Sequence, residues 1–307
     1  MSMLSTPLVA DSVARLFAAT IDPRPKSGVR FPEIAGRSTT ISIPTRHGDT
    51  TATVYHPEPR GGRPAVYVNV HGGGFVVGHP EQDDPWCRFL AAHAGVVVIN
   101  TDYVLAPHRR FPAPVEQIYD VLQWTSSADR DWDGSVLCVG GQSAGGNLAA
   151  AASRLALENG RPGIRLQVLH YPTLDLVTRT RDKSTPVGRA AVLRPWMGEV
   201  FDTAYIPDPA QRRDRLASPA WGTNGDGLVG IAPALVVTAG FDRLRDEAAV
   251  YARKLAAVGA LAEYHEVSGV DHGYNIMSAA PEAADATRRT YALMAEHVFR
   301  ATSAGRP

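Results

Sequence analysis

Cysteine is scarce in this sequence, and neither sign of charge is in excess. Cys87 and Cys138 are the only cysteines among 307 residues, and Cys138 lies in an apolar run, where a buried thiol is the usual outcome. We therefore expect no disulfide. The 31 basic and 31 acidic side chains give a formal net charge of zero, so no overall field attracts nucleic acid or an anionic membrane. The expected partner is a small molecule and not a nucleic acid.

The sequence also lacks segments that would insert in a membrane or hold a metal ion. No apolar run approaches the roughly 20 residues that cross a bilayer, and the opening MSMLSTPLVADSVARLF has no basic leader before an apolar core. No H-E-x-x-H or comparable ligand cluster occurs, which argues against a zinc hydrolase. We expect a cytoplasmic protein with no stable membrane insertion and no metal.

Short apolar runs bounded by Gly, Pro, Asn or Asp recur from residue 64 onward, and helical segments such as 114–126 and 246–258 separate most of them. The predicted strands are AVYVNV, GVVVINTDY, SVLCVGG, IRLQVLHYP, PALVVTAGFD and LAEYHEVSG. Continuously apolar strands that alternate with helices predict an α/β fold with a mostly parallel central sheet and helices on both faces. Upstream, TTISIP and TTATVYH flank His47-Gly48-Asp49 and predict a hairpin.

Two segments do not follow this alternation. Residues 1–38 begin with a helical pattern that breaks at Asp22-Pro23-Arg24-Pro25, and residues 175–222 are rich in Pro, Arg and aromatic residues without a clear strand. Ligands of open α/β sheets bind at the carboxyl edge of the strands. Length alone permits one domain or two. We interpret residues 1–307 as a single domain in which these two segments form a helical cap over that edge.

The pentapeptide Gly141-Gln142-Ser143-Ala144-Gly145 fits the pattern G-x-S-x-G between an apolar strand and an alanine-rich helix. A tight strand-to-helix turn strains the serine backbone, and side chains at the two glycine positions would clash with the neighbouring strand and helix. Ser143 is therefore a candidate nucleophile at the positive end of a helix dipole. The alternative is a small-residue turn that packs the helix on the strand.

HGGGFVVG, at residues 71–78, directly follows the strand AVYVNV. Its three consecutive glycines leave backbone N–H groups uncovered, as a tetrahedral oxyanion requires. A phosphate cradle is the alternative. However, Val77 stands where G-x-G-x-x-G needs its third glycine, and no glycine-rich stretch precedes the Lys and Ser/Thr of a P-loop. The sequence favours an oxyanion site over a nucleotide site.

A serine nucleophile needs a base, and the base needs a carboxylate; in this type of sheet their order is Ser, Asp or Glu, His. Asp242 ends the strand PALVVTAGFD at the edge that carries Ser143. Asp246 competes with it, but begins DEAAVYARKL and is expected to cap that helix. His272 follows the last predicted strand. Three other histidines fall in strands or in the final helix: His170, His265 and His297.

Four ordered motifs, HGGGFVVG, GQSAGGN, FDRLRDE and DHG, resemble the hormone-sensitive-lipase-like group of α/β-hydrolases, the bacterial family IV esterases. The resemblance covers about residues 64–275. It implies the α/β-hydrolase fold and a carboxylesterase that needs no cofactor. It also implies that Ser143 is the nucleophile, His272 the general base and then acid, and Asp242 the carboxylate that orients the histidine.

The same resemblance implies an oxyanion hole formed by the N–H groups of Gly73, Gly74 and Ala144. Ala144 also follows from being the residue after the nucleophile. His71 is expected to shape the glycine loop by hydrogen bonding. Gln142 departs from the family, in which an acidic residue commonly precedes the serine. This change bears on the pH optimum and the rigidity of the site, and not on the reaction class.

The expected substrate is a small-molecule ester with a short or medium acyl chain, bound in an apolar pocket under the cap. The residues expected to line this pocket are Phe17, Trp196, Met197, Phe201 and Tyr205. An amidase or acyltransferase would use the same catalytic residues. A non-catalytic small-molecule receptor could keep the same fold. Such a receptor is expected to lack the catalytic base, whereas His272 is present here. Because family members are often dimers through the last strand or helix, a homodimer is also expected.

Overall fold

A central sheet of eight strands runs through the computed structural model, which describes residues 3–22, 26, 29–31, 34, 37–59, 61–127 and 129–303. The strands are β1 (Arg37–Ile43), β2 (Thr50–His56), β3 (Ala65–Val70), β4 (Val97–Asp102), β5 (Asp133–Gln142), β6 (Ile164–His170), β7 (Ala234–Ala239) and β8 (Leu261–Val267). Their order in the sheet is β1-β2-β4-β3-β5-β6-β7-β8. From β4 to β8 all neighbouring strands are parallel, whereas β2 pairs antiparallel with both β1 and β4. The predicted strands and hairpin are confirmed.

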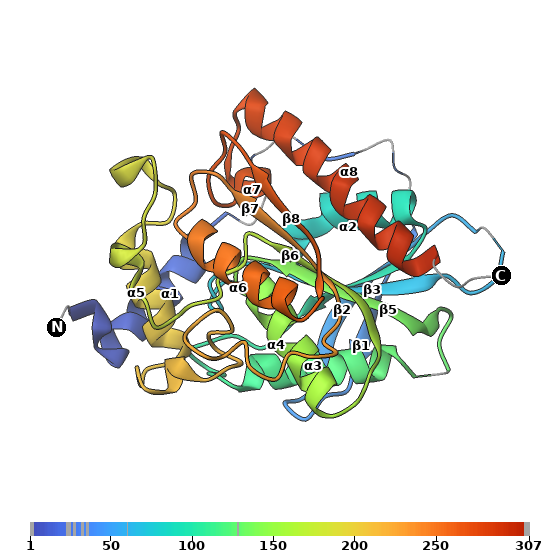
Figure 1. Ribbon diagram of the computed structural model, residues 1–307, viewed down its shortest axis with the longest axis horizontal. Coiled ribbons are helices and arrows are strands. Elements are labelled where there is room, and N and C mark those ends of the chain that lie inside the picture. Colours follow the sequence, from blue (N-terminus) through green and yellow to red (C-terminus); the bar gives the residue numbers. More distant parts are fainter. Residues whose placement is uncertain are drawn as a thin grey trace.

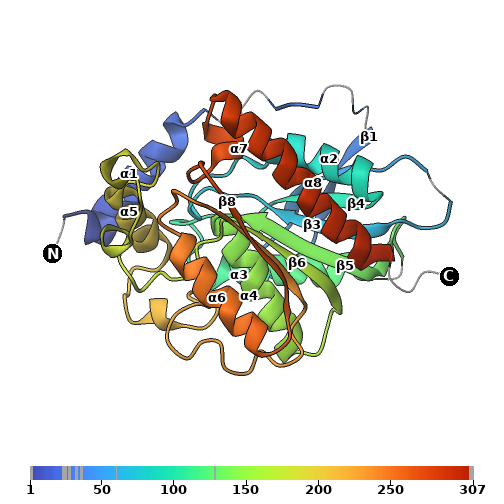
Figure 2. The ribbon, with the colours of Figure 1, turned by 45° about the horizontal axis from the view of Figure 1, so that its top comes forward.

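Helices cover both faces of the sheet, as predicted. They are α1 (Pro7–Thr20), α2 (Asp84–Ala94), α3 (Ala113–Thr125), α4 (Ala144–Glu158), α5 (Pro195–Tyr205), α6 (Arg245–Ala257), α7 (Tyr274–Met277) and α8 (Pro281–Ser303). The helices α2 and α8 lie on one face, and α3, α4 and α6 lie on the other (Figures 1 and 2). The mostly parallel α/β fold predicted from the alternating pattern is therefore confirmed.

The central strands are apolar on both sides because each side faces a separate layer of helices. In β3, Val66 and Val68 belong to the core under α3 and α4, whereas Tyr67 belongs to the core under α2 and α8. Every residue of β3 is buried, which explains its continuous apolar run. Cys87 on α2 and Cys138 on β5 are buried free thiols.

The helices α1 and α5, far apart in sequence, lie side by side at one end of the molecule (Figures 1 and 2). The ring of Phe17 on α1 lies 5.5 Å from that of Phe201 on α5. Within residues 175–222, α5 is accompanied by short 3-10 turns and no strand. Residues 23–25, where the sequence predicts the break after the first helix, lie outside the described residues.

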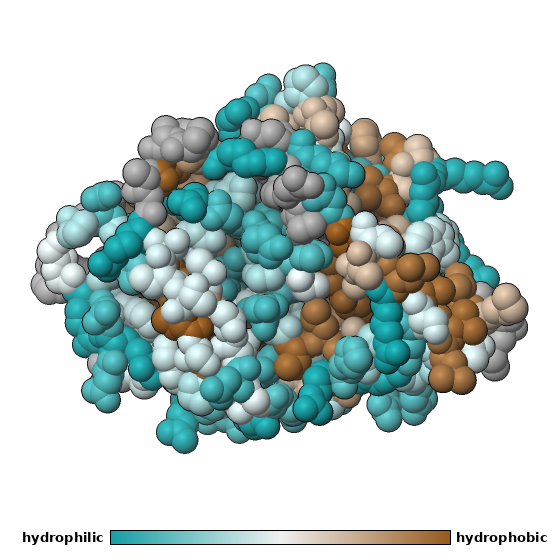
Figure 3. All heavy atoms as spheres, turned by 180° about the vertical axis from the view of Figure 1, so that it is seen from behind, coloured by the Kyte–Doolittle hydropathy of each residue, from teal (hydrophilic) through white to brown (hydrophobic). Residues whose placement is uncertain are grey.

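Apolar side chains gather at the end of the molecule that carries α1 (Figure 3). On η1 (Met3–Ser5) and α1, Met3 and Leu8 are each 79% exposed and Leu16 is 65% exposed. Among the described residues, no helix combines the length and the apolar character that crossing a bilayer requires.

Candidate active site

Ser143 occupies the single residue between β5 and α4, where the chain turns sharply. Its backbone has φ 55° and ψ −119°, an unusual conformation for a residue with a side chain. Its N–H donates to the carbonyl oxygen of His170 at 2.9 Å, and its own carbonyl oxygen accepts the N–H of Thr173 at 3.2 Å. Contacts with the chain at the end of β6 therefore hold the strained turn on both sides.

The glycines around Ser143 are required by the closeness of the neighbouring chain. A Cβ atom on Gly141 or on Gly145 would collide with the carbonyl oxygen of Val70, at the end of β3. On Gly145 it would also lie 2.5 Å from the carbonyl oxygen of His71. The geometry agrees with the reason for the two glycines that the sequence suggests.

The structure brings Ser143, His272 and Asp242 together at the carboxyl edge of the sheet. Ser143 Oγ lies 2.9 Å from His272 Nε2, and His272 Nδ1 lies 2.7 Å from Asp242 Oδ2. An ionised carboxylate only accepts hydrogen bonds, so Nδ1 carries the proton and Nε2 is left to accept the serine hydroxyl. Both Asp242 and His272 are buried. This tautomer can take a proton from Ser143.

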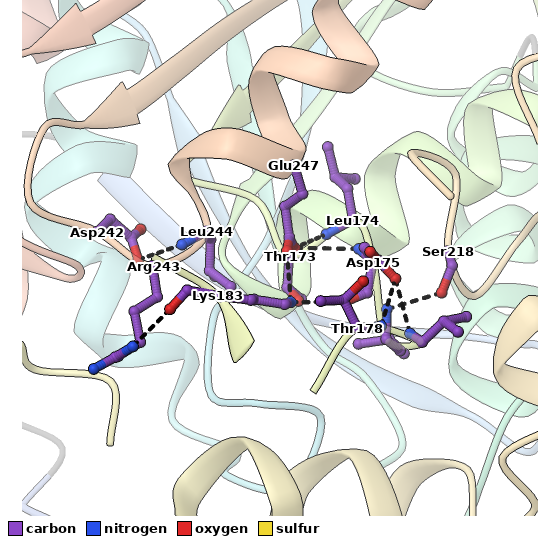
Figure 4. Close-up of polar contacts among 12 residues, drawn as sticks. Thr173, Leu174, Asp175, Thr178, Lys183, Ser218, Asp242, Arg243, Leu244 and Glu247 are labelled. Atoms are coloured by element: carbon purple, nitrogen blue, oxygen red, sulfur yellow. Dashed lines mark hydrogen bonds and ion pairs between the residues drawn. The ribbon is translucent and has the colours of Figure 1, made fainter. Parts of the chain in front are cut away.

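The turn after β7 fixes Asp242 and also holds the segment that contains α5. Asp242 Oδ1 accepts the N–H of Leu244 at 2.9 Å. The adjacent Arg243 donates to the carbonyl oxygens of Lys183 at 2.7 Å, Gly188 at 2.9 Å and Leu193 at 3.0 Å. Figure 4 shows Asp242 and the Arg243 contact with Lys183 in this network. The turn after β7 therefore orients the Asp242 carboxylate and, through Arg243, binds residues 175–222 at three carbonyl oxygens.

Asp246, the competing carboxylate, points elsewhere. It is the second residue of α6 and not its N-cap, so the expected capping role is wrong. Its side chain is 59% exposed, accepts the hydroxyl of Ser184 at 2.7 Å and pairs with Arg245 at 2.9 Å. Of the two carboxylates considered, only Asp242 contacts His272.

The glycine loop after β3 lies beside Ser143 with its N–H groups uncovered. Gly73 and Gly74 have φ 133° and 61°, and a Cβ on either would collide with Val77 or with the ring of Phe201. In the described part of the chain, the N–H groups of Gly73, Gly74 and Ala144 donate to no protein acceptor. These donors are therefore available to an oxygen bound beside Ser143.

His71 lies below this loop and does not face the cavity. It is fully buried, stacks on the ring of Tyr103 at 4.3 Å, and its Nδ1 lies 2.6 Å from the carbonyl oxygen of Gly72. Since a carbonyl only accepts, Nδ1 donates. Burial lowers the pKa of His71 to about 4, so the ring is neutral at pH 7. Its contacts fit the expected role in shaping the loop.

Gln142 is held by polar side chains behind the nucleophile. Its amide nitrogen donates to the carboxylate of Asp83, and its amide oxygen accepts from Asn275 at 3.0 Å and contacts the hydroxyl of Tyr171. An acidic side chain at this position would face the buried carboxylate of Asp83. The neutral amide is complementary to that carboxylate, which gives a physical reason for the departure from the family pattern.

A cavity of about 240 Å³ opens onto Ser143 and His272. Its lining is mostly apolar, and α1, α5 and α7 contribute Phe17, Met197, Phe201 and Met277. Of the five residues expected to line the pocket, Phe17, Met197 and Phe201 do so.

The expectation that Trp196 and Tyr205 also line the cavity is wrong. Tyr205 is fully buried and stacks on Phe75 at 3.9 Å, and Trp196 is 39% exposed at the surface. The sequence could not separate them from Phe201, because all three are aromatic residues of the same short helix. Sequence reasoning also missed Asp83, Tyr171 and Asn275, whose polar network forms only when distant segments fold together.

The family model that matches residues 67–276 describes the α/β hydrolase fold. The chain belongs to the hormone-sensitive-lipase-like group of this family. It is 34% identical to the carboxylic ester hydrolase LipN of Mycobacterium tuberculosis, over 88% of this chain and 73% of that protein. It is also 34% identical to the ethyl acetate hydrolase of Pseudomonas putida, over 80% of this chain and 78% of that protein.

A solved esterase structure has a similar architecture. The esterase from Pyrobaculum calidifontis matches with a TM-score of 0.78 and 31% identity, over 98% of this chain and 94% of that one. The similarity extends beyond the motifs to nearly the whole chain, including α1 and α5.

Gly145→Ala tests the contact between the serine turn and β3. We expect the added methyl group to lower the free energy of unfolding by roughly 1–3 kcal/mol, because it collides with the carbonyl oxygen of Val70. Urea denaturation followed by circular dichroism measures this loss. Gly163→Ala is the matched control, since no atom lies within 4 Å of its Cβ position. Equal unfolding midpoints for the two variants would contradict the contact.

The raised pKa of Asp83 predicts that the stability of the fold depends on pH. Burial raises the pKa of its carboxyl group to about 7, although Asn69 donates to it. The folded protein therefore binds a proton that the unfolded chain releases near pH 4, so this group stabilises the fold at low pH and loses that effect as pH rises through about 7.

We expect Asp83→Asn to flatten the decline in stability between pH 5 and pH 8 by at most roughly 3 kcal/mol, because the pKa of about 7 lies two units above the start of this range. Urea midpoints at the two pH values give the slope for each variant, which removes any constant effect of the substitution. Asp208→Asn, which neutralises an exposed carboxylate, serves as the control. A slope in Asp83→Asn as steep as in the unmodified protein would exclude Asp83 as its source.

Proposed function

We propose that this protein is a serine carboxylesterase that hydrolyses short- to medium-chain carboxylic esters through an acyl-enzyme intermediate. The observation that carries this proposal is the hydrogen-bonded series from Ser143 Oγ through His272 to Asp242, with separations of 2.9 and 2.7 Å, beside a cavity. The ester-hydrolysing activity named for its relatives supports the same reaction class.

In the first step, Ser143 Oγ attacks the ester carbonyl carbon while His272 Nε2 takes the hydroxyl proton. Negative charge develops on the carbonyl oxygen, and the N–H groups of Gly73, Gly74 and Ala144 stabilise it. These donors are fixed before the reaction, so little reorganisation is needed at that moment. Asp242 stabilises the imidazolium that forms on His272 and keeps its ring in place.

The first half of the reaction ends when His272 passes this proton to the leaving alcohol, and the acyl group stays on Ser143. In the second half, His272 takes a proton from the water that attacks the acyl carbon, and it returns a proton to Ser143 Oγ as the acid leaves. No metal ion or organic cofactor has a role in this scheme.

The cavity limits the size of the substrate. Its volume of about 240 Å³ is below the roughly 300–1,000 Å³ typical of sites for drug-sized ligands. This size favours short and medium acyl chains.

We assign the cap to α1 and α5 within a single domain, because their side chains Phe17, Met197 and Phe201 border the cavity. A homodimer and a cytoplasmic location stay predictions.

Ser143→Ala tests the proposed nucleophile. We expect the unmodified protein to turn over the shorter members of a p-nitrophenyl ester series from acetyl to palmitoyl, with EDTA present. We expect the variant to lose at least roughly 10³-fold in kcat, because the attacking oxygen is gone. Release of p-nitrophenolate measures the rate, and circular dichroism checks the fold.

Absence of turnover by the folded, unmodified protein on every ester would overturn the esterase. A matched p-nitroanilide series and added alcohol acceptors would then show whether the same residues serve an amidase or an acyltransferase. Failure on all of these, together with binding of a small molecule, would favour the receptor alternative.

Asp242→Asn and Asp246→Asn form a second test, since each replaces one of the two candidate carboxylates by an amide. We expect Asp242→Asn to lower kcat by roughly 10³- to 10⁴-fold, because an amide does not hold the reactive tautomer of His272. Asp246→Asn removes an exposed carboxylate and should change kcat by less than about twofold. A comparable loss in both variants would contradict the assignment of Asp242.

A further inference from the structure

A second, smaller cavity of about 40 Å³ adjoins Ser143. It shares Ser143, Gly74, Leu193 and Phe201 with the larger cavity, so the two meet at the nucleophile. Since one water molecule needs roughly 10–15 Å³, the smaller cavity has room for a group of a few non-hydrogen atoms. Its walls differ from those of the larger cavity, because four polar side chains line it: Thr173, Thr180, Lys183 and Asp202.

Three of these polar groups lack a hydrogen-bond partner among the residues that the structure describes. Asp202 is 8% exposed, Thr180 6% and Thr173 9%, so each is more than nine-tenths buried. Within the described residues, neither the carboxylate of Asp202 nor the two hydroxyl groups form a hydrogen bond. Buried polar groups of native proteins are nearly always hydrogen-bonded. Their remaining capacity therefore faces the cavity.

Lys183 is held differently. Its ammonium group donates to the carbonyl oxygen of Asp175 at 2.7 Å and lies 2.5 Å from Glu247 Oε2. The other oxygen of Glu247 accepts the N–H groups of Leu174 at 2.6 Å and Asp175 at 3.1 Å (Figure 4). The charge of Lys183 is thus fixed in the wall by Glu247. Lys183 and Arg212 also attract the carboxylate of Asp202, but within the described residues it has no hydrogen bond and no direct ion pair.

The position of His272 decides which part of an ester enters the smaller cavity. In the proposed mechanism, His272 protonates the leaving alcohol, so the alcohol must lie on the side of His272. His272 lines the larger cavity and not the smaller one. The smaller cavity borders Ser143, Gly74 and Phe75. We therefore place the acyl chain there and the alcohol in the larger cavity.

The polar walls restrict what the acyl chain can carry. An alkyl group would leave the Asp202 carboxylate buried without a hydrogen bond, and a second carboxylate would be repelled by it. An ammonium group on the acyl chain would be repelled by the ammonium group of Lys183. A hydroxyl group fits all the walls, because it donates to Asp202 and can accept from Thr173 or Thr180.

We propose that this cavity is an acyl subsite for a hydroxyl group, so that the enzyme prefers esters of short hydroxy acids. The proposal rests on the proposed esterase function. The hydrolysis itself is unchanged: the acyl-oxygen bond breaks and water supplies the new oxygen. The substrate hydroxyl donates a hydrogen bond to Asp202 and keeps its proton.

Two pairs of ethyl esters test this preference, because each pair exchanges a terminal hydroxyl for a methyl group of similar size. Ethyl glycolate is compared with ethyl propanoate, and ethyl 3-hydroxypropanoate with ethyl butanoate. We expect kcat/KM to favour the hydroxy ester in at least one pair by roughly 10- to 100-fold, as expected for a buried hydrogen bond to a charged group. Base consumption in a pH-stat measures all four esters in the same way.

Asp202→Leu replaces the carboxylate by an apolar side chain of similar size. We expect it to remove or reverse the preference, by lowering kcat/KM for the hydroxy ester and raising it for the alkyl ester. If this variant does not fold, Asp202→Asn keeps the shape and removes the charge, and its preference should fall below that of the unmodified protein. Asp208→Asn, an exposed carboxylate near α5, should retain the preference.

Two results would overturn the subsite. One is equal kcat/KM for both members of each pair in the unmodified protein. The other is a preference that survives unchanged in the folded Asp202 variants. If none of the four esters nor p-nitrophenyl acetate is hydrolysed, the proposed esterase function fails, and the subsite fails with it. Turnover of the alkyl esters without a preference would reject the subsite alone.

Discussion

The site depends on the backbone of Ser143, which the surrounding chain holds at φ 55°. Such a conformation costs on the order of 1–3 kcal/mol for a residue with a side chain. Here it is maintained by the hydrogen bonds of Ser143 with His170 and Thr173, and by the close approach of Gly145 to Val70. Because these contacts come from β3 and from the chain around the end of β6, the serine is aligned only when the centre of the sheet has formed.

The same edge of the sheet supplies the remaining groups of the site. Asp242 follows β7, His272 follows β8, and the glycine loop follows β3. Parallel strands end at one edge, so short loops are sufficient to bring these residues together. The segment of residues 175–222 adds the walls of the cavities and not the reacting groups. In this proposal, reactivity is set by the sheet, and selectivity by Asp202 and Phe201 on α5.

The sequence predicted the sheet well because its buried strands are continuously apolar and are separated by Gly, Pro and Asp. The three residues of the hydrogen-bonded series could be proposed for a related reason, since each lies in the segment that follows a strand at the same edge of the sheet. The side chains of α5 were predicted only in part, since Met197 and Phe201 border the cavity and Trp196 and Tyr205 do not. Tyr205 and Phe201 are both aromatic and four residues apart, yet one stacks on Phe75 and the other borders the cavity.

Polar partners that come from distant segments leave no local pattern. The contact between Gln142 and Asp83, and the exposure of Asp202 and Thr180 to one small cavity, depend on how separate elements pack. Sequence reasoning could state that Gln142 departs from its family. It could not identify the carboxylate that makes the amide favourable.

Arg243 has a consequence for how residues 175–222 of this chain can be exchanged. Its guanidinium group holds the carbonyl oxygens of Lys183, Gly188 and Leu193, and its neighbour Asp242 orients His272. The inserted segment is therefore not an independent module that recombination can exchange freely. A chimera that imports residues 175–222 from another protein must also import a matching turn at residues 242–247, or the foreign segment will lose its anchor.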